Sequence, residues 1–244
     1  MKQNESLAET RAVFVLFAQK PNKTEQSPEY GFFCGGFYGR INENSKNAEG
    51  GRSMTNAPKT VLAIHDLPGF GRAALSVIVP VLSTLGVQTV ALPTAVLSTH
   101  TGGLGTPAKL ANPGYGPAAL EHYHRLGVKF DCIYSGYLAD AAQAKLVEQA
   151  FELWPRAFKV VDPVLGDGGR LYSGLGADMV PAMYSLCSKA DLIVPNVTEA
   201  ALLLGEDYRN VPTSQAGMEQ WLSRLSLEGK RSVVITGVSF APKT

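Results

Sequence analysis

From Thr60 onward, short apolar runs alternate with longer segments in which apolar residues recur at helical spacing. Near-continuous apolar runs are typical of strands buried on both faces, and the amphipathic segments are typical of helices that cover a sheet. The predicted strands lie at residues 61–65, 87–92, 131–134, 160–161, 192–194 and 232–238. The predicted helices lie at about residues 72–85, 141–153, 176–187, 198–204 and 214–227, with a further helix that follows the loop at 98–116 and ends at about 126. This alternation predicts an α/β fold with a doubly wound, mostly parallel sheet and helices on both faces.

The first 53 residues do not share this pattern. After an apolar run at Ala12–Ala18 they are rich in Asn, Glu, Lys, Ser and Gly, with no sustained strand or helix period. Met54 then leads directly into the first predicted strand. We therefore expect residues 1–53 to be a poorly ordered N-terminal extension, with Met54 as the natural start, or else a genuine but poorly ordered arm. Residues 54–244 would form the domain.

The composition is that of a globular protein with a sizeable core. Of the 244 residues, 45% are hydrophobic and 18% are charged, and the net charge is +1. This balance predicts neither nucleic acid nor an anionic membrane as a partner. No apolar run reaches the roughly 18 residues of a membrane-spanning helix. The three cysteines are widely spaced and form no CxxC pair, which fits a reducing cytoplasm.

The central stretch of the domain runs from Lys159 to Gly174. Its apolar run ends at Asp162, Pro163 stops the strand because it has no N–H to donate, and a glycine-rich loop with Asp167 follows. In open α/β sheets, ligands bind outside the carboxyl ends of the strands. Taken alone, the stretch is equally well interpreted as a strand end with two solvated acids.

A second segment of the same kind changes that balance. The strand at 192–194 ends at a proline, and Asn196 and Glu199 follow at the start of a helix. Two neighbouring strand ends would gather Asp162, Asp167, Asn196 and Glu199 around one crevice. Mg²⁺ is usually held by one or two carboxylates together with substrate phosphates and water, so these side chains predict a magnesium site.

Polar residues follow the other predicted strands as well. The set comprises Asp66, Thr94, Ser135, Tyr137 and Thr236. Any single polar residue at such a place could be a turn former or a cap, as Thr198 could be for its helix. Six successive strand ends with polar groups are what a doubly wound enzyme presents to a substrate.

These segments carry a resemblance to a known family. From about Thr60 the chain resembles the pyridoxal/pyridoxamine (vitamin B6) kinases of the ribokinase-like superfamily. DPVLGD at 162–167 and PNVTEAALL at 195–203 match superfamily motifs in the right order. SGYLAD at 135–140 and LPTAVLSTHTGG at 92–103 resemble segments of the B6 branch, and VVITGV at 233–238 resembles the strand whose threonine contacts the nucleotide.

The resemblance implies transfer of the ATP γ-phosphoryl group to the 5′-hydroxymethyl group of a B6 vitamer, in a cytoplasmic homodimer. The residues that it places near the pyridine substrate are Asp66, Thr94 and Tyr137. Those that it places at ATP are Asp162, Asp167, Asn196, Glu199 and Thr236, with Asp162 and Glu199 as Mg²⁺ ligands. Asp66 stands where the family commonly has serine. His100 is either a hydrogen-bonded loop residue or a substrate contact.

One family feature is missing from the sequence. Family members carry a GxGD motif that opens a helix and supplies the catalytic base, and this chain contains no GxGD. We therefore expect an incomplete ribokinase-like domain whose C-terminal part is missing, with the base beyond Thr244. Two alternatives stay open: a hydroxymethylpyrimidine kinase of thiamine synthesis, and a non-catalytic fragment that only binds nucleotide or vitamer.

Overall fold

The structure is a computed structural model that describes residues 58–102, 104–111, 113–172 and 174–240. The predicted extension at residues 1–53 and the predicted start at Met54 lie outside the described residues.

Parallel strands form the centre of the domain. The strands are β1 (Thr60–Phe70), β2 (Gln88–Thr99), β3 (Lys109–Leu110), β4 (Cys132–Ser135), β5 (Phe158–Val161), β6 (Gly166–Asp167), β7 (Arg170–Leu171), β8 (Leu192–Ile193) and β9 (Ser232–Val233). Seven of them form one sheet in the order β3-β2-β1-β4-β5-β8-β9. Within it only β3 runs antiparallel to its neighbour. The predicted mostly parallel sheet is confirmed.

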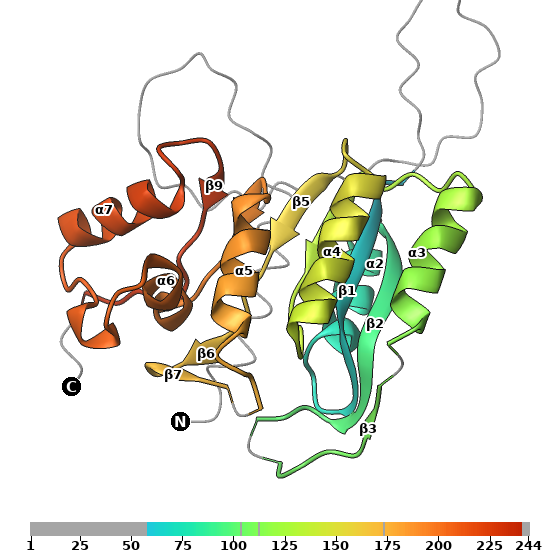
Figure 1. Ribbon diagram of the computed structural model, residues 1–244, viewed down its shortest axis with the longest axis horizontal. Coiled ribbons are helices and arrows are strands. Elements are labelled where there is room, and N and C mark those ends of the chain that lie inside the picture. The colour runs from blue at the N-terminus through green and yellow to red at the C-terminus, as the bar shows by residue number, and fades with distance from the viewer. Residues whose placement is uncertain (1–57, 103, 112, 173, 241–244) are drawn as a thin grey trace, which may run out of the picture. The chain divides into compact units, whose positions relative to one another are not determined.

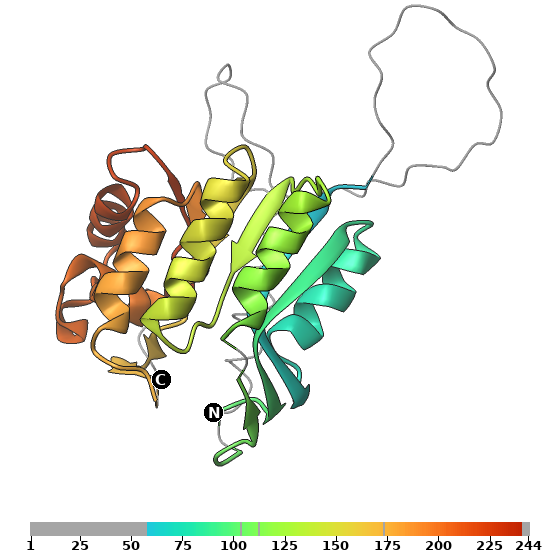
Figure 2. The same ribbon diagram turned by 45° about the vertical axis from the view of Figure 1, so that its right-hand side comes forward.

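Helices lie on both faces of this sheet. They are α2 (Leu75–Thr84), α3 (Tyr115–Arg125), α4 (Ala141–Leu153), α5 (Met179–Ser188), α6 (Val197–Leu204), the 3₁₀ turn η1 (Tyr208–Asn210) and α7 (Gln215–Leu225). Figures 1 and 2 show α3, α4 and α5 side by side on one face, with α2 on the other. No helix in the described part of the chain is long and apolar enough to cross a membrane.

The alternation of side chains along β1 explains the two layers. Leu62 and Ile64 join the core beneath α3, α4 and α5, whereas Val61 and Ala63 pack with α2 on the opposite face. Successive side chains of a strand point to opposite faces, so an apolar run without polar interruption covers both.

The first two strands are longer than the sequence predicts. Residues 66–70, which follow the predicted strand at 61–65, are part of β1, and β2 continues through Pro93 to Thr99. A proline is tolerated there because β3 pairs with β2 only at Val96 and Leu97, so the outer side of β2 is open at Pro93. The β1–β2 register shifts between His65 and Leu67, where Thr94 and Ala95 of β2 lie opposite Asp66, so the irregularity places one extra residue in β2.

The glycine-rich loop after β5 contains the short hairpin β6–β7, which the sequence analysis did not predict. A Cβ atom on Gly166 would lie 2.1 Å from the Arg170 carbonyl oxygen, so this position requires glycine. At the other end of the sheet, the predicted strand 232–238 shrinks to β9 and an isolated bridge between Asn196 and Thr236.

One buried arginine joins two helix ends. Arg231 is 9% exposed. Its Nε donates to the Leu225 carbonyl at the end of α7 at 2.6 Å, and its Nη1 donates to the Cys187 carbonyl near the end of α5. A cation at a helix C-terminus is stabilised by the helix dipole. Here one guanidinium serves two helices.

Candidate functional site

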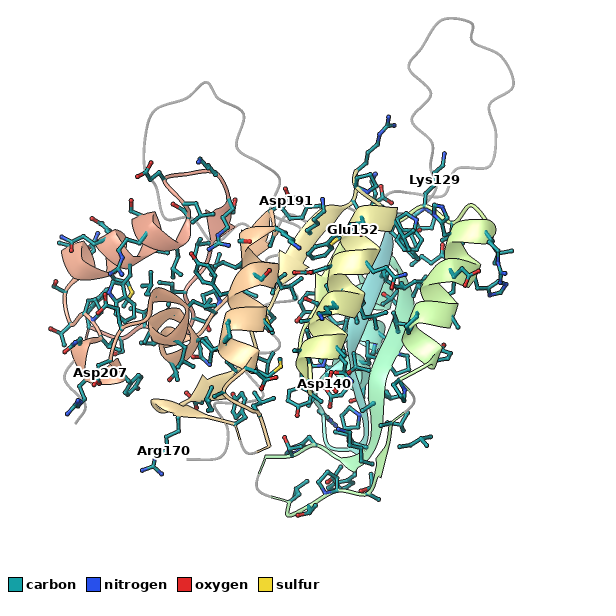
Figure 3. All side chains as sticks on the ribbon, viewed as in Figure 1. Lys129, Asp140, Glu152, Arg170, Asp191 and Asp207 are labelled. Atoms are coloured by element: carbon teal, nitrogen blue, oxygen red, sulfur yellow. The ribbon has the colours of Figure 1, made fainter. Side chains whose placement is uncertain are left out.

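The strand order gathers the candidate residues along the carboxyl edge of the sheet. Reading from β2 to β9, the edge presents Thr94, Asp66, Tyr137, Asp162, Asn196 and Thr236. The hairpin β6–β7 and the far ends of β1 and β2 lie at this end of the domain (Figure 1). Figure 3 shows Asp140 and Arg170 at the same end, with Lys129, Glu152 and Asp191 at the opposite end.

The topology marks one position on this edge. From β1 the chain crosses to β2 on one side, and β4 and β5 follow on the other side of β1. The order therefore reverses between β1 and β4. In doubly wound sheets, this switch point is where the connecting loops part and ligands bind.

Four side chains at this point form what we call the switch-point group: His65, Asp66, Thr94 and Tyr137. The His65 Nδ1 atom lies 2.5 Å from Asp66 Oδ1, and the Tyr137 backbone N–H donates to His65 Nε2 at 3.2 Å. Thr94 Oγ1 donates to the Tyr137 carbonyl at 3.5 Å. Three strand ends are thus tied together through His65 and Tyr137.

Gly136 makes room for the imidazole. A Cβ atom at this position would lie 1.9 Å from His65 Cδ2 and 2.0 Å from Nε2. Next to it, burial raises the pKa of Tyr137, and the negative charge of Asp66 raises it further. Sequence reasoning treated His65 as the last residue of a strand and missed it. The available signal was a histidine and an acid at consecutive strand-end positions.

Farther along the edge lies a second cluster, which we call the loop–helix group: residues 165–169 with Asn196, Thr198 and Glu199. The Leu165 N–H donates to Glu199 Oε1 at 3.1 Å, Asn196 Nδ2 donates to the Gly166 carbonyl at 2.8 Å, and the Gly169 N–H donates to Thr198 Oγ1 at 3.0 Å. Three hydrogen bonds therefore join residues 165–169 to the first turn of α6 and its N-cap.

The same turn carries a capping box. The Asn196 side chain accepts the Glu199 N–H at 2.9 Å, and Glu199 Oε2 accepts the Asn196 N–H at 2.8 Å. Asn196, and not Thr198, is thus the N-cap of α6. Glu199 accepts a backbone N–H on each carboxylate oxygen, so it shapes the loop as well as facing the edge.

Two acids lie close together here. Glu199 is 3% exposed, and burial raises its pKa well above the usual range, with the charge of Asp162 raising it further. The Tyr134 hydroxyl donates to Asp162 Oδ2 at 3.4 Å. Two adjacent buried carboxylates are costly to ionise together, and a divalent cation would relieve that cost. The described ranges hold no group of three or more His, Cys, Asp or Glu that would bind a metal alone. Phosphate oxygens would therefore have to complete an Mg²⁺ site.

The remaining candidates have local roles in the structure. The exposed Asp167 carboxylate accepts the Gly168 N–H at 2.8 Å, within its own loop. Thr236 pairs through its backbone with the segment that precedes α6, because its N–H donates to the Pro195 carbonyl at 2.9 Å. His100 Nδ1 accepts the Gly102 N–H at 3.1 Å, and its ring lies where a Cβ on Gly71 would be. These contacts favour the loop-residue interpretation of His100.

Comparisons with known proteins agree with this architecture. A family model described as phosphomethylpyrimidine kinase matches residues 82–244. A candidate phosphomethylpyrimidine kinase of Bacteroides thetaiotaomicron, crystallised with pyridoxal, is 40% identical with a TM-score of 0.70. The pyridoxal kinase of Lactobacillus plantarum is 39% identical with a TM-score of 0.68.

These alignments cover most of this chain and less of the relatives. They include 75% of this chain and 64% of the Bacteroides protein, and 74% of this chain and 64% of the Lactobacillus protein. The pyridoxal kinase of Deinococcus radiodurans is 27% identical over 194 residues, which are 74% of this chain and 63% of that enzyme. The chain therefore spans just under two thirds of these relatives.

Proposed function

Because the chain belongs to the phosphomethylpyrimidine kinase family, we propose that its function is that of a pyridoxal kinase. The reaction would move the γ-phosphoryl group of ATP to the 5′-hydroxymethyl group of a B6 vitamer. The observation that carries this choice within the family is the pair of relatives at 39–40% identity. One of them is a pyridoxal kinase and the other was crystallised with pyridoxal.

The two clusters divide the work in this proposal. The switch-point group binds the vitamer ring through Asp66, Thr94 and Tyr137. The loop–helix side binds the nucleotide through Asp162, Asp167, Asn196, Glu199 and Thr236. The three hydrogen bonds between α6 and the loop fix the backbone of residues 165–169, so this side of the site is preorganised.

Magnesium would be held by Asp162 and Glu199 together with ATP phosphates. When bound, it would neutralise phosphate charge during transfer. Both oxygens of Glu199 already accept backbone N–H groups, so Asp162 is the better placed direct ligand. We assign no residue of this chain as the catalytic base. Binding is therefore the property to measure first.

A second candidate function is hydroxymethylpyrimidine phosphorylation, which the name of the matching family favours.

We also propose that the protein is a homodimer and that it is located in the cytoplasm. The two cysteines in the described part of the chain are free and buried, and burial raises the pKa of each to about 12. Such thiols are inert core groups, which suits a reducing compartment.

The test is calorimetric titration of the full chain with pyridoxal, pyridoxamine, hydroxymethylpyrimidine and MgATP. We expect a vitamer to bind more tightly than the pyrimidine, and ATP to bind only with Mg²⁺, so that EDTA abolishes the signal. Asp162→Asn should weaken MgATP binding about tenfold or more. Asp207→Asn, which removes an exposed acid, is the matched control. Tighter pyrimidine binding would favour the second candidate, and no binding of any vitamer would overturn the proposal.

A further inference from the structure

Gln143 is a side chain of α4 that reaches the switch-point group from outside it. Its amide nitrogen Nε2 donates to the Thr94 carbonyl at 3.1 Å, and its amide oxygen Oε1 accepts the Ala139 N–H at 2.8 Å. A carbonyl can only accept and a backbone N–H can only donate, so these two contacts fix the orientation of the amide. The backbone of Gln143 is fixed as well, because its N–H donates to the side chain of Asp140, the N-cap of α4, at 2.9 Å.

The Gln143 amide joins two strand ends that do not pair with each other. In the sheet, β1 lies between β2, which carries Thr94, and β4, which leads into Tyr137 and Ala139. The Thr94 hydroxyl also reaches across to the Tyr137 carbonyl, but that bond is 3.5 Å long and therefore weak. The bond from Gln143, at 3.1 Å, is the stronger of the two ties across the end of β1.

Thr94 lies where the pairing of β1 with β2 is disrupted. The register shifts at Asp66, because Thr94 and Ala95 of β2 both lie opposite this single residue. A disrupted ladder holds the backbone less firmly, so the position of Thr94 depends on contacts from outside these two strands. Binding contacts have to be held within about 0.5 Å of their productive geometry. The Gln143 amide supplies a contact that can do this.

We propose that Gln143 is a positioning residue of the switch point, which sets the spacing of Thr94 and Tyr137 and thereby the affinity for the vitamer. This inference rests on the proposed function, in which Thr94 and Tyr137 bind the vitamer ring. Both ends of the Gln143 amide are engaged with the protein, so Gln143 acts through these residues and not by touching the ligand. Its loss should therefore weaken vitamer binding and leave the nucleotide side unchanged.

The test titrates pyridoxal, pyridoxamine and MgATP separately into the full chain by calorimetry. Gln143→Met keeps the length of the side chain and removes both hydrogen bonds, so we expect the vitamers to bind about tenfold more weakly. The affinity for MgATP should not change, because other hydrogen bonds hold the loop–helix group. Gln149→Met, at an exposed position of the same helix, is the matched control and should leave all three affinities unchanged.

Two further variants isolate the bond to Thr94. Gln143→Glu keeps an acceptor for the Ala139 N–H but places a carboxylate oxygen, which cannot donate, at the Thr94 carbonyl. We expect it to weaken vitamer binding at least as much as Gln143→Met does. Thr94→Val completes a double-mutant cycle. If Gln143 acts through the spacing of Thr94, the loss caused by Gln143→Met should shrink to about twofold or less in the Thr94→Val background.

Each outcome decides a different point. Wild-type vitamer affinity in Gln143→Met or Gln143→Glu, or additive losses in the cycle, overturns this inference while the proposed function stands. An equal loss of vitamer and MgATP binding in Gln143→Met would show that Gln143 supports the domain as a whole, which overturns the inference too. Failure of the wild-type chain to bind either vitamer overturns both the inference and the proposed function.

Discussion

The switch-point group and the loop–helix group lie on one sheet edge but are assembled differently. The first joins strand ends that are far apart in the chain, with His65 and Tyr137 separated by 72 positions. The second joins two segments about 30 positions apart, through several side-chain bonds to backbone groups. The loop–helix group therefore has the denser and more redundant bonding. The switch-point group depends on the placement of a single ring.

The most damaging single change should fall on the loop–helix group at Glu199. Glu199→Ala removes the acceptor for two N–H groups and leaves a cavity, so the free energy of unfolding should fall by about 3 kcal/mol. Urea denaturation followed by circular dichroism measures it. Glu219→Ala on the exposed face of α7 is the control, and a Glu199→Ala loss as small as the control's would contradict the structural role.

In the switch-point group, the substitution that we expect to be destabilising is at Gly136. Gly136→Ala places a methyl group in the position of the His65 ring, and overpacking of this kind costs about 1–3 kcal/mol. If the ring is the obstacle, the same change made in a His65→Ala background should cost less than about 1 kcal/mol. Additive losses in the double-mutant cycle would show that another contact is responsible.

A milder substitution tests a single hydrogen bond of the loop–helix group. Thr198→Val keeps the volume but removes the acceptor of the Gly169 N–H, and should cost about 1 kcal/mol. Thr198→Ser keeps the acceptor, so this variant should bind nucleotide as tightly as the wild-type chain does. If Val and Ser variants bind MgATP alike, the Gly169 bond does not shape the loop.

The smallest effect is a change of slope with pH. Glu199 has a raised pKa in the fold, so above its usual value of 4.5 the folded chain keeps a proton that the unfolded chain has lost. The free energy of unfolding attributable to Glu199 therefore falls as the pH rises from 4.5 through the raised pKa. Asp162→Asn removes one cause of the shift, so unfolding measured from pH 4.5 to neutral should show a shallower fall. An unchanged slope would show that the charge of Asp162 does not contribute to the raised pKa of Glu199.

The sequence carried most of the fold because its signals are periodic. The α4 helix was predicted at its observed bounds, and Pro163 ends β5 as expected. The extension of β2 through Pro93 was not predictable, because it depends on which strand lies next to β2. The hairpin β6–β7 was missed because two-residue strands have no period, and its glycines favour a loop interpretation.

The residues of the candidate site also differ in whether their roles could be predicted from the sequence. Asn196 and Glu199 are spaced as a capping box, so their joint action at a helix start was readable from the chain. The role of His65 was not readable in this way, since it depends on a backbone N–H from a distant strand end. The buried position of Glu199 is likewise tertiary information, because α6 buries it by lying against the loop.

Arg231 has a consequence for the cooperativity of unfolding. Its guanidinium binds the last turns of α5 and α7, which belong to different parts of the chain, so neither helix can fray without stripping a buried cation of its partners. Backbone amides of α5 and α7 should therefore exchange with solvent deuterium as one cooperative unit rather than as two independent helices. The edge of the sheet around β8 and β9 would then open in a single step, and α6, which lies between these helices in the chain and carries Glu199, would lose its order in that same step.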